Sequence, residues 1–248
     1  MRNIYSLILT FVLLVPLVYF YFISGAGYTH QLTKVEDLPN LSLQQETICE
    51  LEEKLKRAGL VDIQSIDSSI KVALMYSSSD NFLKYDIYGC LEKGYLYKVA
   101  ALKLAKAQKY LKELYPDYSL LVCDAVRPLS VQYKMWEIVK DTSMRPYIAN
   151  PDGGSMHNYG AAVDITIIDS HGAQLDMGTP VDFFEDLSQP VLEEQYLFQK
   201  KLTQEQLANR RLLRSVMEQA GFIGISNEWW HFDAFEKNWI RKNLKIIP

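Results

Sequence analysis

The stretch Ser155–Ile168 constrains the fold of this chain most, because it joins a polar loop to a short apolar run. From Ala161 the residues are small or β-branched and apolar at alternate positions, which predicts a strand. Its valine and isoleucine side chains would share one face, and Asp164 would point from the other. The loop before the strand carries His157, and the glycines at 153, 154 and 160 let it fold back over the strand's end. The sequence therefore predicts that an imidazole and a carboxylate converge.

A second imidazole and a second carboxylate occur near the C-terminus, in the run Glu228–His231. Two histidines, His157 and His231, and Asp164 would make three protein ligands, the number that catalytic zinc takes while leaving one position to water. Glu228 could take the proton of that water without being a ligand. Residues three apart in a straight strand point to opposite faces, so the site needs a bend or bulge near the two tryptophans. The alternative, in which a histidine is only a satisfied core residue, stays open here.

The N-terminal residues predict export or membrane anchoring. The run Ile4–Ile23 holds no charged residue and only Arg2 precedes it, and about 20 apolar residues span a bilayer as a helix. The aromatic residues at 19–22 favour an uncleaved anchor, whereas Ser24-Gly25-Ala26 would suit signal cleavage, and both interpretations stay open. Either one places the rest of the chain in the periplasm or at the outer face of the inner membrane. We expect a signal or anchor at 1–27, a linker at 28–40 and one domain at 41–248.

Composition narrows the class of protein. The chain has 248 residues, 48% of them hydrophobic and 23% charged, which suits one globular domain with a buried core. The net charge is −4 with acidic and basic residues interspersed, so we expect no nucleic-acid partner. The three cysteines form no metal-binding spacing; Cys123 lies in an apolar run and is expected to be buried. A disulfide between Cys49 and Cys90 would suit an oxidising compartment, and the sequence leaves it open.

The apolar patterns predict helices over 42–58, 98–114, 131–139 and 203–220, and strands within 60–76 and over 118–124, 161–168 and 229–235. A turn at 169–172 predicts a hairpin that returns through 174–177. Strands and helices do not alternate regularly. The expected fold class is therefore α+β, a mainly antiparallel sheet flanked by helices, as a single catalytic domain after the N-terminal segment.

Five motifs, taken in chain order, resemble those of one known family. They are Arg127-Pro128 after a strand, Ser155-x-His157-x-x-Gly160-x-Ala162-x-Asp164, Met177-Gly178-Thr179 with Asp182, Asn209-Arg210-Arg211, and Glu228-Trp229-Trp230-His231. Together they resemble the zinc D-alanyl-D-alanine dipeptidases, the VanX-type family. The resemblance covers most of residues 60 to 235 and does not reach the N-terminal 40 or so.

The resemblance implies a site and a cofactor. By it, His157, Asp164 and His231 bind one zinc ion per chain, and 41–248 is a zinc peptidase domain. Glu228 would be the general base, and Arg127 would stabilise the transition state at the scissile carbonyl. These roles agree with the chemistry of the side chains, since a carboxylate accepts a proton and a guanidinium offers two donors.

The resemblance also implies a substrate, a small peptide of the D-Ala-D-Ala type from the bacterial cell wall, with Ser155 and Asp182 holding its free amino end. Two other functions stay open: a carboxypeptidase that trims longer wall peptides, and a wall-binding protein whose zinc is structural. Arg127 could instead pair with Asp124 on the surface, and Asp182 could be a solvated loop carboxylate. Val126 departs from the family, which often has an aromatic residue there, so a wider pocket beside Arg127 is expected.

Overall fold

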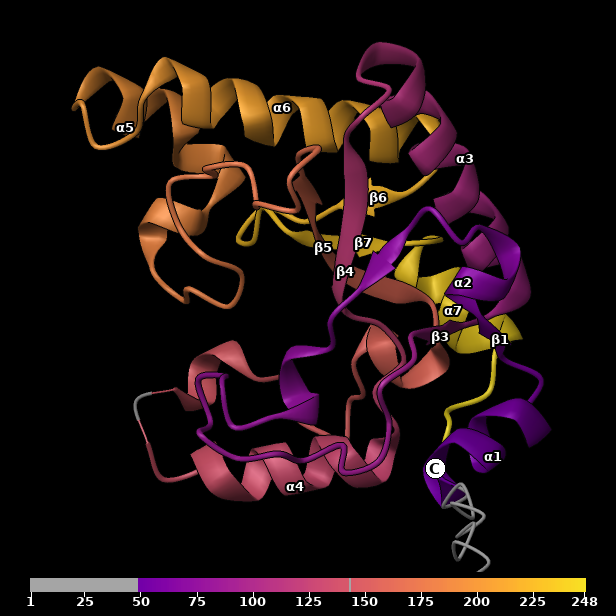
Figure 1. Ribbon diagram of the computed structural model, residues 1–248. Helices are drawn as coiled ribbons and strands as arrows, with labels where there is room; N and C mark the ends of the chain where they lie inside the picture. The colour runs from indigo at the N-terminus through magenta and orange to yellow at the C-terminus, as the bar shows by residue number, and fades with distance from the viewer. Residues whose placement is uncertain (1–48, 143) are drawn as a thin grey trace, which may run out of the picture. The chain divides into compact units, whose positions relative to one another are not determined.

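A mixed five-stranded sheet forms the centre of the computed structural model, which describes residues 49–142 and 144–248 (Figure 1). Its strands, in spatial order, are β2 (Lys71–Val72), β4 (Ser119–Asp124), β5 (Ala162–Ile168), β7 (His231–Asp233) and β6 (Ile223–Gly224). β2 pairs parallel with β4, whereas the other neighbours are antiparallel. The α+β class is confirmed, and the expectation of a mainly antiparallel sheet is corrected to a mixed one. The chain leaves β2 and returns to β4 through the helix α3, and such a crossover is what parallel pairing requires.

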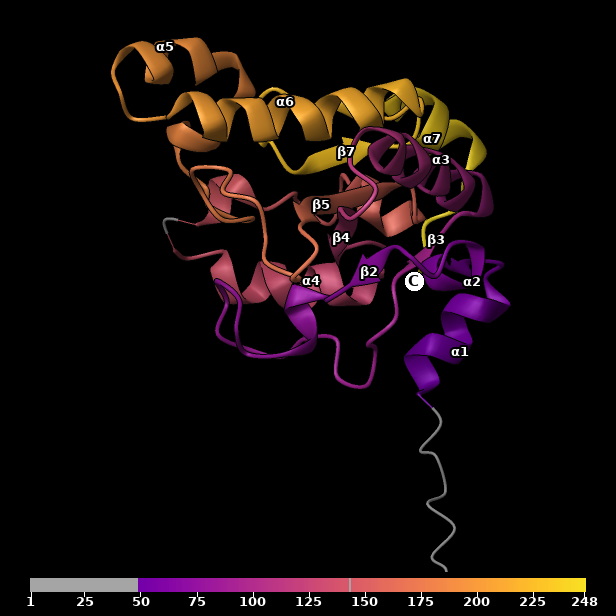
Figure 2. The same ribbon diagram turned by 45° about the horizontal axis from the view of Figure 1, so that its top comes forward.

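Two long helices cover one face of this sheet. α3 (Lys98–Leu114) has the bounds that its apolar stripe predicts, and α6 (Gln204–Gln219) begins at the capping box formed by Thr203 and Gln206. In Figure 2 both helices lie above the centre of the sheet, and in Figure 1 α4 (Leu129–Val139) lies below the strands. The alternate residues of β5 contact the helices as expected, and the core there contains Val163, Ile165, Ile167, Leu104, Ala107, Leu111, Leu213, Val216 and Met217. The opposite face of β5 carries the polar side chains of Asp164 and Thr166.

A second apolar cluster lies between α4, α1 (Glu50–Arg57) and the long irregular segment that precedes α3. Cys49, just before α1, forms a disulfide with Cys90 of that segment. Cys123 is a buried free thiol, as predicted. Where one or two strands were expected, the chain forms β1 (Val61–Asp62), the short helix α2 (Ile63–Ile66) and β2, and β1 pairs with β3 (Tyr95–Leu96).

The remaining elements are short: η1 (Met75–Ser77), η2 (Arg145–Tyr147), η3 (Met156–Tyr159), η4 (Asp186–Ser188), η5 (Pro190–Leu192), α5 (Glu193–Phe198) and α7 (Lys237–Asn243). The expected hairpin after β5 is reduced to one bridge between Ile168 and Gln174. β7 is shorter than the predicted 229–235, because residues 229 and 230 form a bend.

The proposed membrane segment at 1–27, the linker at 28–40 and the first residues of the predicted 42–58 helix lie outside the described residues. Within residues 49–142 and 144–248, none of the helices is long and apolar enough to cross a membrane.

Candidate metal centre and active site

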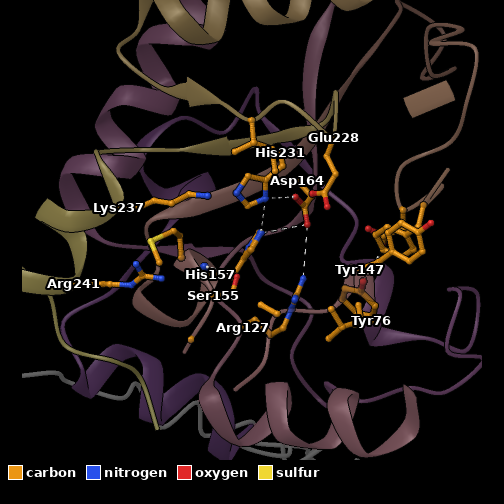
Figure 3. Close-up of a pocket in the computed structure, with 17 residues that line it drawn as sticks. Tyr76, Arg127, Tyr147, Ser155, His157, Asp164, Glu228, His231, Lys237 and Arg241 are labelled. Carbon is orange, nitrogen blue, oxygen red and sulfur yellow. Dashed lines mark hydrogen bonds and ion pairs between the residues drawn. The ribbon is translucent and has the colours of Figure 1, made fainter. Parts of the chain in front are cut away.

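Three buried side chains converge on the polar face of the sheet, as the sequence predicts. Asp164 of β5 lies directly opposite His231 of β7 in the antiparallel ladder, so the two side chains share a face, with Oδ1 and Nδ1 3.0 Å apart. His157 reaches them from η3, and its Nε2 lies 3.3 Å from Asp164 Oδ2 and 3.2 Å from His231 Nδ1. One ligand atom from each residue lies within 4.8 Å of the other two (Figure 3). We call these residues the triad.

Hydrogen bonds between neighbouring residues hold the turn η3, which carries His157. The side chain of Ser155 accepts a hydrogen bond from His157 N, and Asn158 Oδ1 accepts one from Ser155 N, which completes a capping box at the start of η3. Gly160 ends η3 in the left-handed region at φ 61°. A Cβ at Gly160 would lie 3.2 Å from the backbone nitrogen of Tyr97, so the glycine serves both backbone conformation and close packing.

Both imidazoles are oriented by a hydrogen bond on the nitrogen that faces away from the triad. His157 Nδ1 donates to the carbonyl of Ala125 at 2.6 Å, which leaves Nε2 for the triad. His231 Nε2 lies 2.9 Å from Asp233 Oδ1, which leaves Nδ1. Metal-binding histidines are typically held in this way by a carbonyl or a carboxylate.

The electrostatics of the triad suit a cation. Burial by itself would raise the pKa of Asp164, but the two imidazoles outweigh it and hold that pKa well below its usual range. Burial would likewise lower the pKa of His231, but Asp164 and Asp233 raise it to about 10. Two imidazole nitrogens and one carboxylate form a donor set that fits a divalent metal ion such as zinc, so the triad could hold one.

Glu228 lines the same pocket without belonging to the triad. It precedes the bend at Trp229 and Trp230, and this bend lets Glu228 and His231 face one pocket, as expected (Figure 3). Burial raises the pKa of Glu228, and the charge of Asp164 adds to the rise against the opposing effect of the imidazoles. The two tryptophans are buried in the core.

Arg127 lines the pocket and pairs with Asp124 away from the surface. Arg127 Nη2 and Nε donate to Asp124 Oδ2 at 2.5 and 3.1 Å, and Nη2 lies 3.8 Å from Asp164 Oδ2. Only 7% of Arg127 is exposed, which rules out the surface pair that the sequence left open. A β-bulge after Val122 puts Asp124 opposite Asp164 in the ladder.

Asp182 lies at another side of the pocket, half-buried and with a left-handed φ of 61°. It accepts a hydrogen bond from Tyr76 Oη at 2.6 Å. Burial and the nearby charge of Asp164 raise the pKa of Asp182 to about 8. Its bond to Tyr76 and its place in the pocket distinguish Asp182 from an ordinary solvated loop carboxylate. Ser155 lines the pocket as well, and Figure 3 shows it beside His157, on the other side of Arg127 from Tyr76.

Residues 56–247 match the profile of the peptidase M15 family, described as D-ala-D-ala dipeptidase. The chain belongs to this family. It is 33% identical over 177 residues to a D-alanyl-D-alanine dipeptidase of Escherichia coli K12, covering 70% of this chain and 83% of the relative. A D-alanyl-D-alanine dipeptidase of Synechocystis is 30% identical over 176 residues, 58% of this chain and 71% of the relative. One from Enterococcus faecium is 27% identical over 193 residues, 70% and 90% of the two chains.

Membership in the D-ala-D-ala dipeptidase family confirms the resemblance drawn from the motifs and makes the protein a peptidase of a metallopeptidase family. The site of this family member is also supported by side chains outside those motifs, of which Tyr76 lines the pocket. Tyr76, Asp124 and Asp233 each hold a predicted site residue in place. Asp233 could have been found, since it lies two residues after His231 and therefore on the same strand face.

The wider pocket that was expected from Val126 is not found. Its side chain is 2% exposed and packs in the second apolar cluster with α4. Val126 is not among the described residues that line the pocket, so this position gives no wider wall beside Arg127.

Proposed function

We propose that this peptidase is a zinc dipeptidase that hydrolyses D-alanyl-D-alanine or related dipeptides of the bacterial cell wall, with one zinc ion held by His157, Asp164 and His231. Relatives of that name support the substrate class. The observation that carries the proposal is one pocket that joins the triad to Glu228, Arg127 and the half-buried carboxylate of Asp182.

Zinc, when bound, supplies a Lewis acid that polarises a carbonyl and lowers the pKa of water. Glu228 takes the proton of the attacking water and passes it to the leaving amine, and its raised pKa suits both transfers. Arg127, fixed by Asp124, donates to the scissile carbonyl oxygen as that oxygen gains charge. Because the guanidinium is already oriented, little reorganisation accompanies the reaction.

Asp182 and Tyr76 would receive the free amino group of the substrate. An ammonium ion there neutralises the carboxylate, whereas the acylated nitrogen of a longer peptide carries no charge and leaves Asp182 without a counter-charge. This favours a dipeptidase over the carboxypeptidase alternative. Since Ser155 lies on the other side of Arg127 from Tyr76, we assign the amino group to Asp182 and place Ser155 beside a more distal part of the substrate (Figure 3).

We also propose that the enzyme works outside the cytoplasm, in the periplasm or at the outer face of the inner membrane. The uncharged run Ile4–Ile23 supports export, either as an anchor or as a cleaved signal. The disulfide between Cys49 and Cys90 supports an oxidising compartment. Cell fractionation tests this: the activity should follow the envelope, and recovery of the intact chain mainly in the cytoplasm would contradict the proposal.

Metal analysis of the purified full chain, combined with peptide hydrolysis, tests the function. We expect about one zinc per chain and faster hydrolysis of D-Ala-D-Ala than of a pentapeptide ending in D-Ala-D-Ala. His157→Ala and His231→Ala should lose most of the zinc. Equal rates on the pentapeptide would favour the carboxypeptidase, and bound zinc without any turnover would favour the wall-binding protein.

A further inference from the structure

Two cations of α7, Lys237 and Arg241, line the pocket (Figure 3). They are four residues apart, so they lie on one face of the helix. Ile240 is fully buried and packs with Met156 and Tyr159 of η3, the turn that carries His157. The helix is therefore fixed against the metal centre while its cationic face meets the pocket.

The charges on this face are poorly compensated. Lys237 Nζ lies 3.9 Å from Asp233 Oδ2, at the limit of an ion pair, and that carboxylate already bonds His231. Among the described residues, Arg241 has no carboxylate oxygen within 4.0 Å of its guanidinium. Like charges at this spacing destabilise a helix, so packing does not explain the pair. A bound anion would neutralise it.

The two ends of the pocket have opposite charge. Figure 3 shows Lys237 and Arg241 on one side of the triad and Tyr76, which bonds Asp182, on the other. A dipeptide is a zwitterion whose scissile carbonyl lies between its ammonium and carboxylate groups. With the ammonium at Asp182 and the carbonyl at the triad, the carboxylate falls on the side of α7.

We propose that Lys237 and Arg241 bind the C-terminal carboxylate of the substrate, an inference that rests on the proposed dipeptidase function. Arg241 can offer two parallel donors to a carboxylate, and Lys237 adds a point charge. The subsite requires a free acid one residue beyond the scissile bond. Together with Asp182, it restricts the substrate at both ends, which is how a pocket selects dipeptides.

The test compares D-Ala-D-Ala with its C-terminal amide, on the zinc-loaded full chain and on the double variant Lys237→Gln/Arg241→Gln. Lys242→Gln is the matched control, because it removes one positive charge from the exposed surface of the same helix outside the pocket. The double variant should lose about tenfold in kcat/KM on the free acid, the size of one charge-assisted hydrogen bond at a partly exposed site. Its kcat/KM on the amide should stay near wild type, as should both values for Lys242→Gln.

A second readout separates binding from folding and chemistry. In a Glu228→Gln background, calorimetry with the intact dipeptide should show the same tenfold loss of affinity, and thermal unfolding should match the parent. An unchanged preference of acid over amide in the double variant would overturn the carboxylate subsite while leaving the dipeptidase intact. A wild-type enzyme that hydrolyses no dipeptide would overturn the proposed function and the subsite with it.

Discussion

Replacing Asp233 should weaken zinc binding although Asp233 is not one of the triad. Its carboxylate accepts from His231 Nε2 at 2.9 Å, and this bond fixes the imidazole with Nδ1 toward Asp164. Asp233 is 2% exposed, so water cannot take over the bond readily. In Asp233→Leu the imidazole loses both its orientation and the charge that makes it a stronger ligand.

The size of the effect follows from what each substitution removes. Loss of a partner behind a ligand typically costs 10- to 100-fold in metal affinity, or about 1.4 to 2.7 kcal/mol. Asp233→Leu removes the acceptor and the charge, so we expect about 100-fold. Asp233→Asn keeps an acceptor oxygen and removes only the charge, so we expect about tenfold.

Competition with a chelator of known zinc affinity measures these constants at fixed pH. Asp117→Asn is the control, because it removes one negative charge from an exposed turn before β4, at the end of that strand away from the triad. Urea unfolding of each metal-free variant separates a loss of fold from a loss of orientation. Wild-type zinc affinity in Asp233→Leu would refute the view that Asp233 orients His231.

Four further predictions concern the chemistry and the fold. Glu228→Gln should keep its zinc and lose about 10² to 10⁴ in kcat, measured by steady-state hydrolysis; a near-normal kcat would remove the general base. Asp182→Asn should chiefly raise KM for D-Ala-D-Ala and reduce the ratio of kcat/KM between D-Ala-D-Ala and the N-acetylated dipeptide. An unchanged ratio would leave the carboxypeptidase alternative open. The pKa of His231 in the metal-free protein is raised to about 10, so zinc binding at pH 7 should release a proton, and zinc affinity should increase from pH 7 toward 10. Calorimetry in buffers of different ionisation enthalpy would detect the released proton. If no proton is released, His231 is not protonated in the metal-free protein. Replacing both Cys49 and Cys90 with serine should lower the free energy of unfolding by about 3 to 4 kcal/mol, which is the loss of chain entropy calculated for a separation of 41 residues. An unchanged midpoint of urea unfolding would show that the disulfide does not constrain the unfolded chain.

The triad could be predicted because each member lies in a local pattern that fixes its direction. The alternation of β5 sets the side of Asp164, and the glycines around η3 allow His157 to turn back. The bend before β7 was predicted from the need to bring Glu228 and His231 into one site. Helix α3 was predicted for a similar reason, since its apolar stripe repeats over 17 residues.

What could not be predicted depends on contacts between distant parts of the chain. Tyr76 bonds Asp182 across 106 residues, and no local period indicates that partnership. The parallel pairing of β2 also escaped prediction, because a strand of two residues carries too little pattern to fix its direction. Arg127 shows the same limit, since the sequence offered its pairing with Asp124 only as a surface alternative. The pair is buried, and Arg127 also bonds Gln132 of α4.

The metal ligands and the proposed substrate-binding groups of the pocket lie on different kinds of elements. Asp124, Asp164 and His231 lie in one row across three hydrogen-bonded strands, so the metal centre and the anchor of Arg127 share a single rigid frame. The groups proposed to hold the two ends of the substrate lie elsewhere, with Asp182 in a loop and Arg241 on a short helix. Loops and peripheral helices tolerate sequence change better than a sheet does. Substitutions at the ends should therefore change which peptide is cleaved while the zinc content stays constant, whereas substitutions of Asp164 or His231 in the row should remove metal and activity together.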